Sequence, residues 1–178
     1  MRVLAFFGAG VICVLLAAAP GRADTVAITA SGTIQPRCGV SVQQAFSSAD
    51  FSTSGSSVAQ ALVDCNTGFR INITSANGAA KTTNQASSGF TNSLPYSLKL
   101  SVPLDSGSPV EATCTSGTLM SGQASCALSP NNASGLSSGG KSAINQIATL
   151  TASWAPPFQK LVAGSYSDTL TVSIASVP

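Results

Sequence analysis

Hydrophobic and polar residues alternate along much of the chain, and no stretch shows a sustained helical period. Successive side chains of a β-strand point to opposite faces, so a period of two predicts strands. The clearest alternation is in Thr25–Ile34, where one face carries Val26, Ile28, Ala30, Gly32 and Ile34. Runs rich in β-branched residues predict further strands at Cys38–Val42, Val58–Cys65, Phe69–Thr74, Tyr96–Val102, Ile147–Trp154 and Ser167–Ile174.

About seven short strands joined by Gly, Pro and Ser connectors predict an all-β fold, specifically an immunoglobulin-like β-sandwich. The strongest turn signal is Asn77-Gly78, because both residues tolerate positive φ. The stretches Ala79–Thr91 and Ser129–Ser142 are polar and poor in aromatic residues, which predicts surface loops. A hairpin closed near its base is one arrangement for the residues between Cys114 and Cys126.

The N-terminal residues predict export. Arg2 is followed by an unbroken run of small and apolar residues from Val3 to Ala19, and Gly21 and Ala23 are small residues at the two positions that signal peptidase reads. We therefore expect residues 1–23 to be a secretory signal peptide, with the mature chain beginning at Asp24. The alternative is a transmembrane anchor, since the run approaches the roughly 18–20 residues that span a bilayer. The cleavage site favours the signal peptide, and no later segment is apolar enough to cross a membrane.

Charge disfavours two kinds of partner. The first 23 residues carry two of the eight Lys and Arg residues and none of the six Asp and Glu residues, so the mature chain is formally neutral. Binding to nucleic acid needs clustered Lys and Arg, and binding to a membrane surface needs a basic amphipathic helix. Neither is present in the sequence. We expect a charge-poor surface solvated mainly by hydroxyl groups, which a protein that polymerises outside the cell can tolerate.

Cysteine usage agrees with export. Cys13 lies in the expected signal peptide, which leaves Cys38, Cys65, Cys114 and Cys126 in the mature chain. An even number of cysteines in an oxidising compartment predicts two disulfides, with three possible pairings. We favour the sequential pairing, Cys38–Cys65 and Cys114–Cys126. A zinc site is the alternative, and the absence of His and of any C-x-x-C spacing disfavours it.

The residue types that catalysis requires are missing or scattered. The chain has no His, which excludes nucleophile pairs of the Ser-His and Cys-His kinds. Gly139–Ser142 resembles a phosphate loop only superficially, because the glycine spacing and the strand–loop–helix context are lacking. Acidic residues occur singly, although two of them could still meet as a glycosidase pair; they include Asp64, Asp105, Glu111 and Asp168. We therefore predict that the protein is not an enzyme and has no catalytic residue, cofactor or metal site.

Two other features each allow two interpretations. Trp154 is expected to pack in the core or at a sheet edge, with a sugar-stacking platform as the alternative. Asn72-Ile73-Thr74 and Asn132-Ala133-Ser134 match the glycosylation sequon, a match that arises often by chance and has no meaning in a bacterial source.

The segment Thr25–Ile34 also allows two interpretations. It precedes the first mature cysteine and is joined to it only by Gln35-Pro36-Arg37. Its ten residues span about 34 Å as a strand. The segment is either the first strand of the sandwich or a donor strand that completes the sheet of a neighbouring molecule. The alternation alone does not separate the two.

Five segments in fixed order carry a resemblance to a known family: Gly32–Ile34 with Cys38–Val40, Val63–Asn66, Phe69–Ile73, Leu94–Leu98 and, most strongly, Ala163–Ile174. Together they resemble the spore coat protein U domain, over essentially the whole mature chain. That family includes the subunits of archaic chaperone–usher pili.

The resemblance implies an incomplete immunoglobulin-like sandwich that lacks its final strand. A periplasmic chaperone would fill the gap first, and at an outer-membrane usher the N-terminal strand of another subunit would replace it. On this chain the donor strand would present Val26, Ile28, Ala30, Gly32 and Ile34. The acceptor groove would be lined partly by the last strand, through Leu170, Val172 and Ile174. The Cys38–Cys65 disulfide would correspond to the family's bridge between early strands.

The expected function is therefore that of a structural subunit of an extracellular pilus, made of like subunits and supporting surface attachment and biofilm formation. The expected division is a signal peptide (1–23), an N-terminal donor strand or extension (24–37) and a pilin-like domain (38–178). The alternatives are a spore-coat or surface-layer protein of the same fold, and a secreted carbohydrate-binding adhesin.

Overall fold

The computed structural model describes residues 31–47, 49–120, 126–129 and 135–177. The chain divides into two units, Met1–Thr33 and Ile34–Pro178, and all strands described below belong to the second. The expected signal peptide (1–23) and the donor positions Val26, Ile28 and Ala30 lie outside the described residues.

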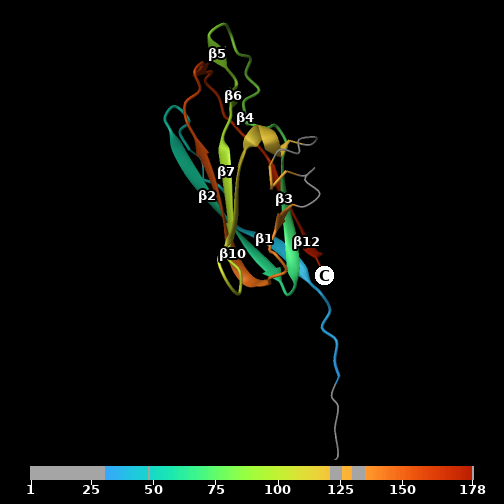
Figure 1. Cartoon of the computed structure of the whole chain (residues 1–178). Coiled ribbons are helices and arrows are strands. Elements are labelled where there is room, and N and C mark those ends of the chain that lie inside the picture. Colours follow the sequence, from blue (N-terminus) through green and yellow to red (C-terminus); the bar gives the residue numbers. More distant parts are fainter. Residues whose placement is uncertain (1–30, 48, 121–125, 130–134, 178) are drawn as a thin grey trace, which may run out of the picture. The chain divides into compact units, whose positions relative to one another are not determined.

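The second unit contains a five-stranded antiparallel sheet (Figure 1). Its strand order is β1-β2-β10-β7-β8, so strands that are distant in sequence lie next to one another. The bounds are Cys38–Gln44 for β1, Gly55–Cys65 for β2, Ser97–Val102 for β7, Val110–Thr115 for β8 and Ala143–Trp154 for β10.

A second, three-stranded antiparallel sheet has the order β12-β3-β9. Its strands are β3 (Gly68–Ser75), β9 (Leu136–Ser137) and β12 (Leu170–Val177). Two small pairs of strands complete the described structure: β4 (Ala80–Lys81) with β6 (Ser93–Leu94), and β5 (Phe90–Thr91) with β11 (Lys160–Leu161). One 3₁₀ turn, Ser116–Leu119, follows β8.

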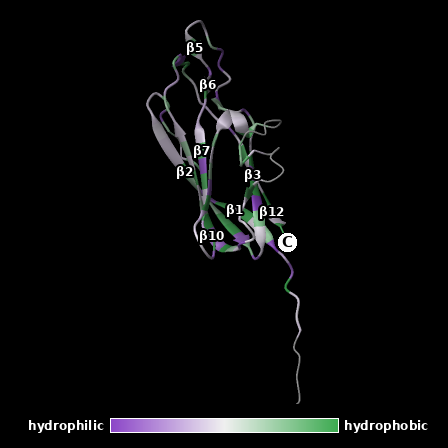
Figure 2. Cartoon of the chain, in the orientation of Figure 1, coloured by the Kyte–Doolittle hydropathy of each residue, from purple (hydrophilic) through white to green (hydrophobic). Residues whose placement is uncertain are grey.

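One hydrophobic core joins the two large sheets. Every second residue along a strand faces this core, as the sequence alternation predicted, and hydrophobic positions recur along the strands in Figure 2. The five-stranded sheet contributes Ala59, Ala61, Val63, Leu98, Leu100, Val102, Ala148 and Leu150, and the second sheet contributes Phe69, Ile71 and Ile73. Because the inner faces of both sheets are apolar, burying them against each other is the main favourable term in folding.

The all-β prediction is confirmed, and each predicted strand that lies within the described second unit corresponds to an observed strand. The last strand begins at Leu170, later than the predicted Ser167, and extends to Val177. Strand β8 was missed because Val110, Ala112 and Cys114 give it a weak alternation of small side chains. The described residues after Cys114 form the 3₁₀ turn rather than a hairpin strand.

Both predicted surface loops are wrong in part. Ala79, Ala80 and Thr82 are buried because β4 pairs with β6, and Ser129 and Ser138 are buried near β3 and β9. In each segment, contacts with distant parts of the chain bury residues that the polar composition of the segment predicts to be exposed. The Asn77-Gly78 turn is present with positive φ only at Gly78, and it joins two strands that do not pair with each other.

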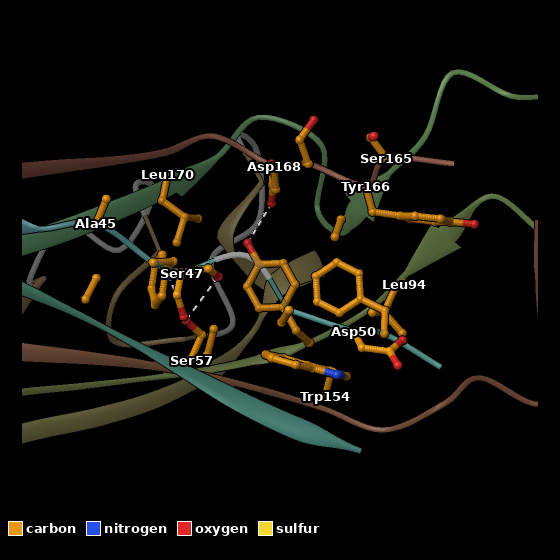
Figure 3. A pocket seen from close by; sticks show the side chains of 18 of the residues that line it. Ala45, Ser47, Asp50, Ser57, Leu94, Trp154, Ser165, Tyr166, Asp168 and Leu170 are labelled. Carbon is orange, nitrogen blue, oxygen red and sulfur yellow. Dashed lines mark hydrogen bonds between the residues drawn. The ribbon is translucent and has the colours of Figure 1, made fainter. Parts of the chain in front are cut away.

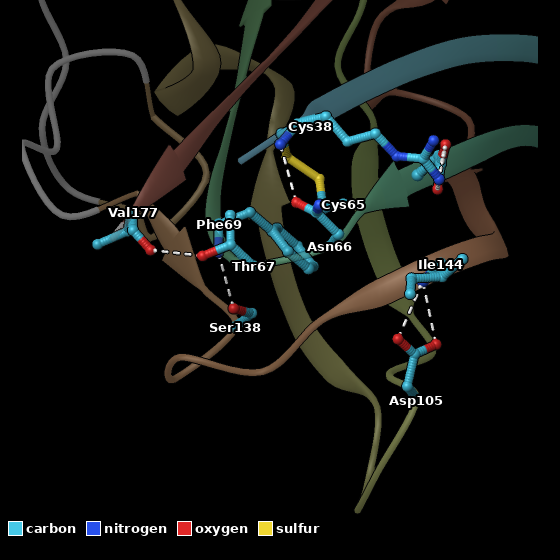
Figure 4. Close-up of a disulfide and its surroundings, with 11 residues drawn as sticks. Cys38, Cys65, Asn66, Thr67, Phe69, Asp105, Ser138, Ile144 and Val177 are labelled. Atoms are coloured by element: carbon cyan, nitrogen blue, oxygen red, sulfur yellow. Dashed lines mark hydrogen bonds and ion pairs between the residues drawn. A yellow bond between two sulfur atoms is a disulfide. The ribbon is translucent and has the colours of Figure 1, made fainter. Parts of the chain in front are cut away.

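Two disulfides join the four described cysteines in the sequential pairing, Cys38–Cys65 and Cys114–Cys126. The first links β1 to β2 at residues that face each other in register (Figure 4). The second attaches the segment at Cys126 to β8, the outermost strand on the opposite side of the five-stranded sheet. Each disulfide therefore secures one edge of that sheet.

Candidate functional site

The site is a groove between the edges of the two sheets. Strand β1 is the outermost strand of the five-stranded sheet, and β12 is the outermost strand of the second sheet. Within the described part of the chain, each of them pairs with a strand on one side only. Both therefore expose backbone N–H and C=O groups that another strand can pair with.

A cavity of about 940 Å³ lies between the end of β1, with the segment that follows it, and the start of β12, with the segment 161–168 that precedes it. We call it the β1–β12 groove (Figure 3). Its floor consists of the core-facing residues Ala59, Ala61, Leu150 and Ala152 of β2 and β10. Most of its lining is apolar; the polar part consists of serine hydroxyl groups, Gln44, Gln60 and the carboxylates of Asp50 and Asp168. An apolar channel of this kind fits extended hydrophobic side chains better than a charged ligand.

The inner face of β12 is incompletely covered. Leu170, Val172 and Ile174 alternate with exposed residues, yet all three are only half-buried, whereas the inner residues of the neighbouring β3 are buried. Leu170 and Val172 line the groove, while Ile174 packs against the core without lining it. The core is thus fully covered beside β3, whereas its side chains beside β12 are still partly exposed to solvent.

The opposite wall was not predicted from the sequence. Val42 of β1 lines the groove and is 76% exposed, and Phe46 lies a few residues further along the same wall. Ser47 and Ser57 hold this wall to β2, since their hydroxyl oxygens lie 3.1 Å apart and Ser47 N–H donates to Ser57 Oγ at 3.1 Å. The signal for this wall in the sequence is the apolar residue Val42, which ends the strand predicted at Cys38–Val42.

An aromatic cluster forms one end of the groove. Phe51 packs edge-on against Trp154 with ring centroids 4.9 Å apart, and against Tyr166 at 6.2 Å. Trp154 is only 9% exposed, and its indole N–H donates to Thr53 O at 3.0 Å. Packing is therefore the role that the structure shows for Trp154, as we expected. Phe51 and Tyr166 were missed because they stand in irregular segments without alternation.

Asp168 organises the polar margin of the groove where β12 begins. Its carboxylate accepts hydrogen bonds from the Tyr96 and Ser75 hydroxyl groups, both at 2.6 Å. It also accepts from the backbone N–H groups of Asn77 (3.1 Å) and Thr169 (2.8 Å). One carboxylate thus connects β12 to the end of β3 and to the residue preceding β7, which fixes the wall of the groove in place.

Tyr96→Phe should lower stability by about 1–2 kcal/mol, because it removes a hydrogen bond to a charged acceptor. Burial, and next the hydrogen bond to Asp168, raise the pKa of Tyr96 above its ordinary value of about 10. Because its pKa is higher in the folded state, the Tyr96 hydroxyl loses its proton in the unfolded chain first as the pH rises. The contribution of Tyr96 to the free energy of unfolding is therefore fully present below pH 10 and declines as the pH rises towards the folded-state pKa. Thermal unfolding between pH 8 and 11 should therefore show the two proteins converging at high pH, and a constant gap would contradict this assignment.

The described donor positions are Gly32 and Ile34. Neither belongs to a strand of the described structure, Ile34 is 87% exposed, and a Cβ at Gly32 would meet no atom within 4 Å. Ile34, which belongs to the second unit, does not line the groove.

Asp50 lines the groove and accepts a hydrogen bond from Ser52 N–H at 2.8 Å, and three other acidic residues form contacts elsewhere. Asp64 pairs with Arg37 at 3.1 Å and Glu111 pairs with Lys99 at 2.9 Å. Hydrogen bonds from Ser142, Gln146 and the Ile144 N–H lower the pKa of Asp105, which lies in a turn beside β10. Among the described residues, no group of three His, Cys, Asp or Glu could hold a metal ion.

Of the two glycosylation sequons, the first has its Asn72 on β3, and the second, at Asn132, lies outside the described residues.

No helix in the described part of the chain is long and apolar enough to span a membrane. Comparisons of the chain with family models, with curated proteins and with solved structures found no match.

Proposed function

We propose that this protein is a structural subunit of an extracellular fibre of the chaperone–usher pilus type, in which each subunit's groove receives an extended strand from another subunit. The β1–β12 groove carries this proposal, because an open apolar channel there lies between two unpaired strand edges. A strand inserted in it would hydrogen bond to an edge through its backbone and cover Leu170 and Val172 with its side chains. The fold that it would complete is an immunoglobulin-like sandwich.

The segment Thr25–Ile34 is long enough to pair along the whole β12 edge, and its pattern suits the apolar groove. It has ten residues, and the β12 edge has eight. Its apolar face has a period of two, which matches the spacing of side chains that point from a strand into one surface. Gly32 suits a shallow part of the channel, since it needs no room for a side chain. A periplasmic chaperone would protect the groove before assembly, and an outer-membrane usher would be the site of exchange.

A coat or surface layer built from the same fold would use the same groove, so it differs from a pilus only in the shape of the assembly. A carbohydrate-binding adhesin has less support, because the aromatic side chains at the groove pack on one another: Phe51 lies edge-on to both Trp154 and Tyr166. The described structure offers no flat, open aromatic face there for a sugar ring.

Peptide binding tests the proposal directly. A chain that begins at Gln35 should bind a synthetic peptide of residues 24–34, and saturation at 100 times the dissociation constant should add about 2.7 kcal/mol to its stability. Trp154 is the only tryptophan in the chain and lines the groove, so its fluorescence should report binding. A peptide with Ile28→Asp is the matched control. Equal stabilisation by both peptides, or by neither, would refute insertion of this strand.

A further inference from the structure

The side chain of Asn66 holds the connection between the N-terminal extension (24–37) and the domain that follows it. It forms hydrogen bonds that the backbone of a neighbouring strand would otherwise form. Cys38 and Cys65 form the last register pair of β1 and β2. Beyond them, Asn66 N–H donates to Arg37 O at 3.2 Å, and Arg37 N–H donates to the side-chain oxygen of Asn66 at 2.8 Å. The same side chain donates its amide hydrogen to Gln35 O at 3.0 Å. Asn66 therefore continues the hydrogen-bond ladder past the end of the sheet.

The pattern of these bonds describes an extended chain. Gln35 O, Arg37 N–H and Arg37 O all face the same neighbour, which is how alternate residues of a strand present their polar groups. Pro36 fixes its own φ and restricts Gln35 to extended conformations. The exposed Arg37–Asp64 ion pair lies on the same segment and adds little by itself. Gln35–Arg37 is thus a straight continuation of β1 that leads away from the sheet.

This geometry limits what the extension can reach. To enter the groove of its own molecule, the chain would have to reverse direction before Gln35, within Ser31–Ile34, and so would use Gly32 and Ile34 in a turn. The remaining alternating residues, Thr25–Ala30, span about 20 Å as a strand, whereas the eight residues of β12 span about 27 Å. A second molecule can accept the whole of Thr25–Ile34 without any reversal.

We propose that Asn66 is a positioning residue that holds Gln35–Arg37 straight and thereby directs the N-terminal extension into the groove of a second copy of this chain instead of its own. This inference rests on the proposed function, since it names the residue that keeps a subunit's strand out of its own groove. Cys38–Cys65 supports the same arrangement by fixing the residue next to the connection.

The test compares Asn66→Ala with Thr67→Ala in the mature chain. Thr67 is in the same turn and donates to Val177 O at 3.3 Å, so its loss perturbs the turn without touching Gln35–Arg37. In Asn66→Ala the Arg37 amide hydrogen should exchange with solvent about tenfold faster, the factor expected for loss of a hydrogen bond, and in Thr67→Ala it should not change. After dilute refolding without a chaperone, Asn66→Ala should give a larger fraction of compact monomer on size-exclusion chromatography than either the wild type or Thr67→Ala.

A second substitution separates self-insertion from a general effect on stability. Ile28→Asp should lower the melting temperature of the Asn66→Ala monomer and leave that of the wild-type monomer unchanged. Only in the Asn66→Ala monomer would the N-terminal strand occupy the groove of its own molecule. The inference is overturned if Asn66→Ala and the wild type give the same monomer fraction, or if Ile28→Asp already destabilises the wild-type monomer. In both cases, binding of the 24–34 peptide would still support the proposed function, whereas failure of that peptide to bind removes both proposals.

Discussion

Replacing Ile28 by Asp should abolish fibre formation, whereas Thr29→Asp should leave it largely intact. The two residues are neighbours in Thr25–Ile34 but lie on opposite faces of the expected strand. In the groove, Asp at position 28 would be an unpaired charge among apolar side chains such as Leu150 and Val172, and burying it is very costly. Asp at position 29 would face solvent.

The energetics explain why one face decides the outcome. Burying Val26, Ile28 and Ile34 contributes roughly 1.5–3 kcal/mol each, and backbone pairing adds a modest net amount. Ordering a free tail costs about 1–2 kcal/mol per residue, so the balance is favourable only if the groove exists before the strand enters. The β1–β12 groove is open in the described structure, which meets this condition.

Fibres would be purified from cells that express each variant together with candidates for the proposed chaperone and usher, and examined by electron microscopy. Thr29→Asp is the matched control for charge and position. If the two variants assemble equally well, the alternation does not set the register, and the extension is a solvated tail rather than a donor strand.

Loss of the first disulfide should have the largest effect on the stability of the domain. Cys38→Ala with Cys65→Ala should cost about 3–4 kcal/mol, because the bridge closes a loop between residues 27 apart. For a domain of this size the melting temperature should fall by roughly 10 °C. The corresponding change at Cys114 and Cys126, which lie 12 residues apart, should cost slightly less.

Thermal unfolding of the oxidised wild type and of both double variants measures these costs. The reduced wild type serves as an internal control, since reduction breaks the same bonds without changing the sequence. The expectation fails if the Cys38→Ala, Cys65→Ala variant melts within about 2 °C of the oxidised wild type, or if mass spectrometry finds peptides that link Cys38 to Cys114.

The strands of the core were predictable because their side chains are large and strictly alternate. Ile71, Ile73 and Leu100 each stand between more polar neighbours in sequence and face the core in the structure. The last strand was located through its alternation at Leu170, Val172 and Ile174, although its bounds shifted by up to three residues. Local pattern is informative wherever the burial of one strand face decides the structure.

The groove could be predicted only in part, since it depends on contacts between distant segments. Phe51 and Tyr166 are 115 residues apart in numbering and meet only because β10 carries Trp154 to the same place. Ala80 and Ser138 are buried by partners that their polar neighbours in sequence gave no reason to expect. Tertiary pairing of this kind leaves no periodic trace in the sequence.

The position of Cys38 has a mechanical consequence for a fibre of the proposed kind. Tension applied to the N-terminal extension enters the domain at Arg37 and Cys38, at the start of an edge strand that could otherwise be peeled away. Cys65 faces Cys38 in register, so the covalent bond transfers the load to β2, which is hydrogen bonded on both sides by β1 and β10. Under load, the hydrogen bonds of β2 would then be sheared together, and the resistance of a subunit to stretching would be set by its central strands rather than by its outermost one.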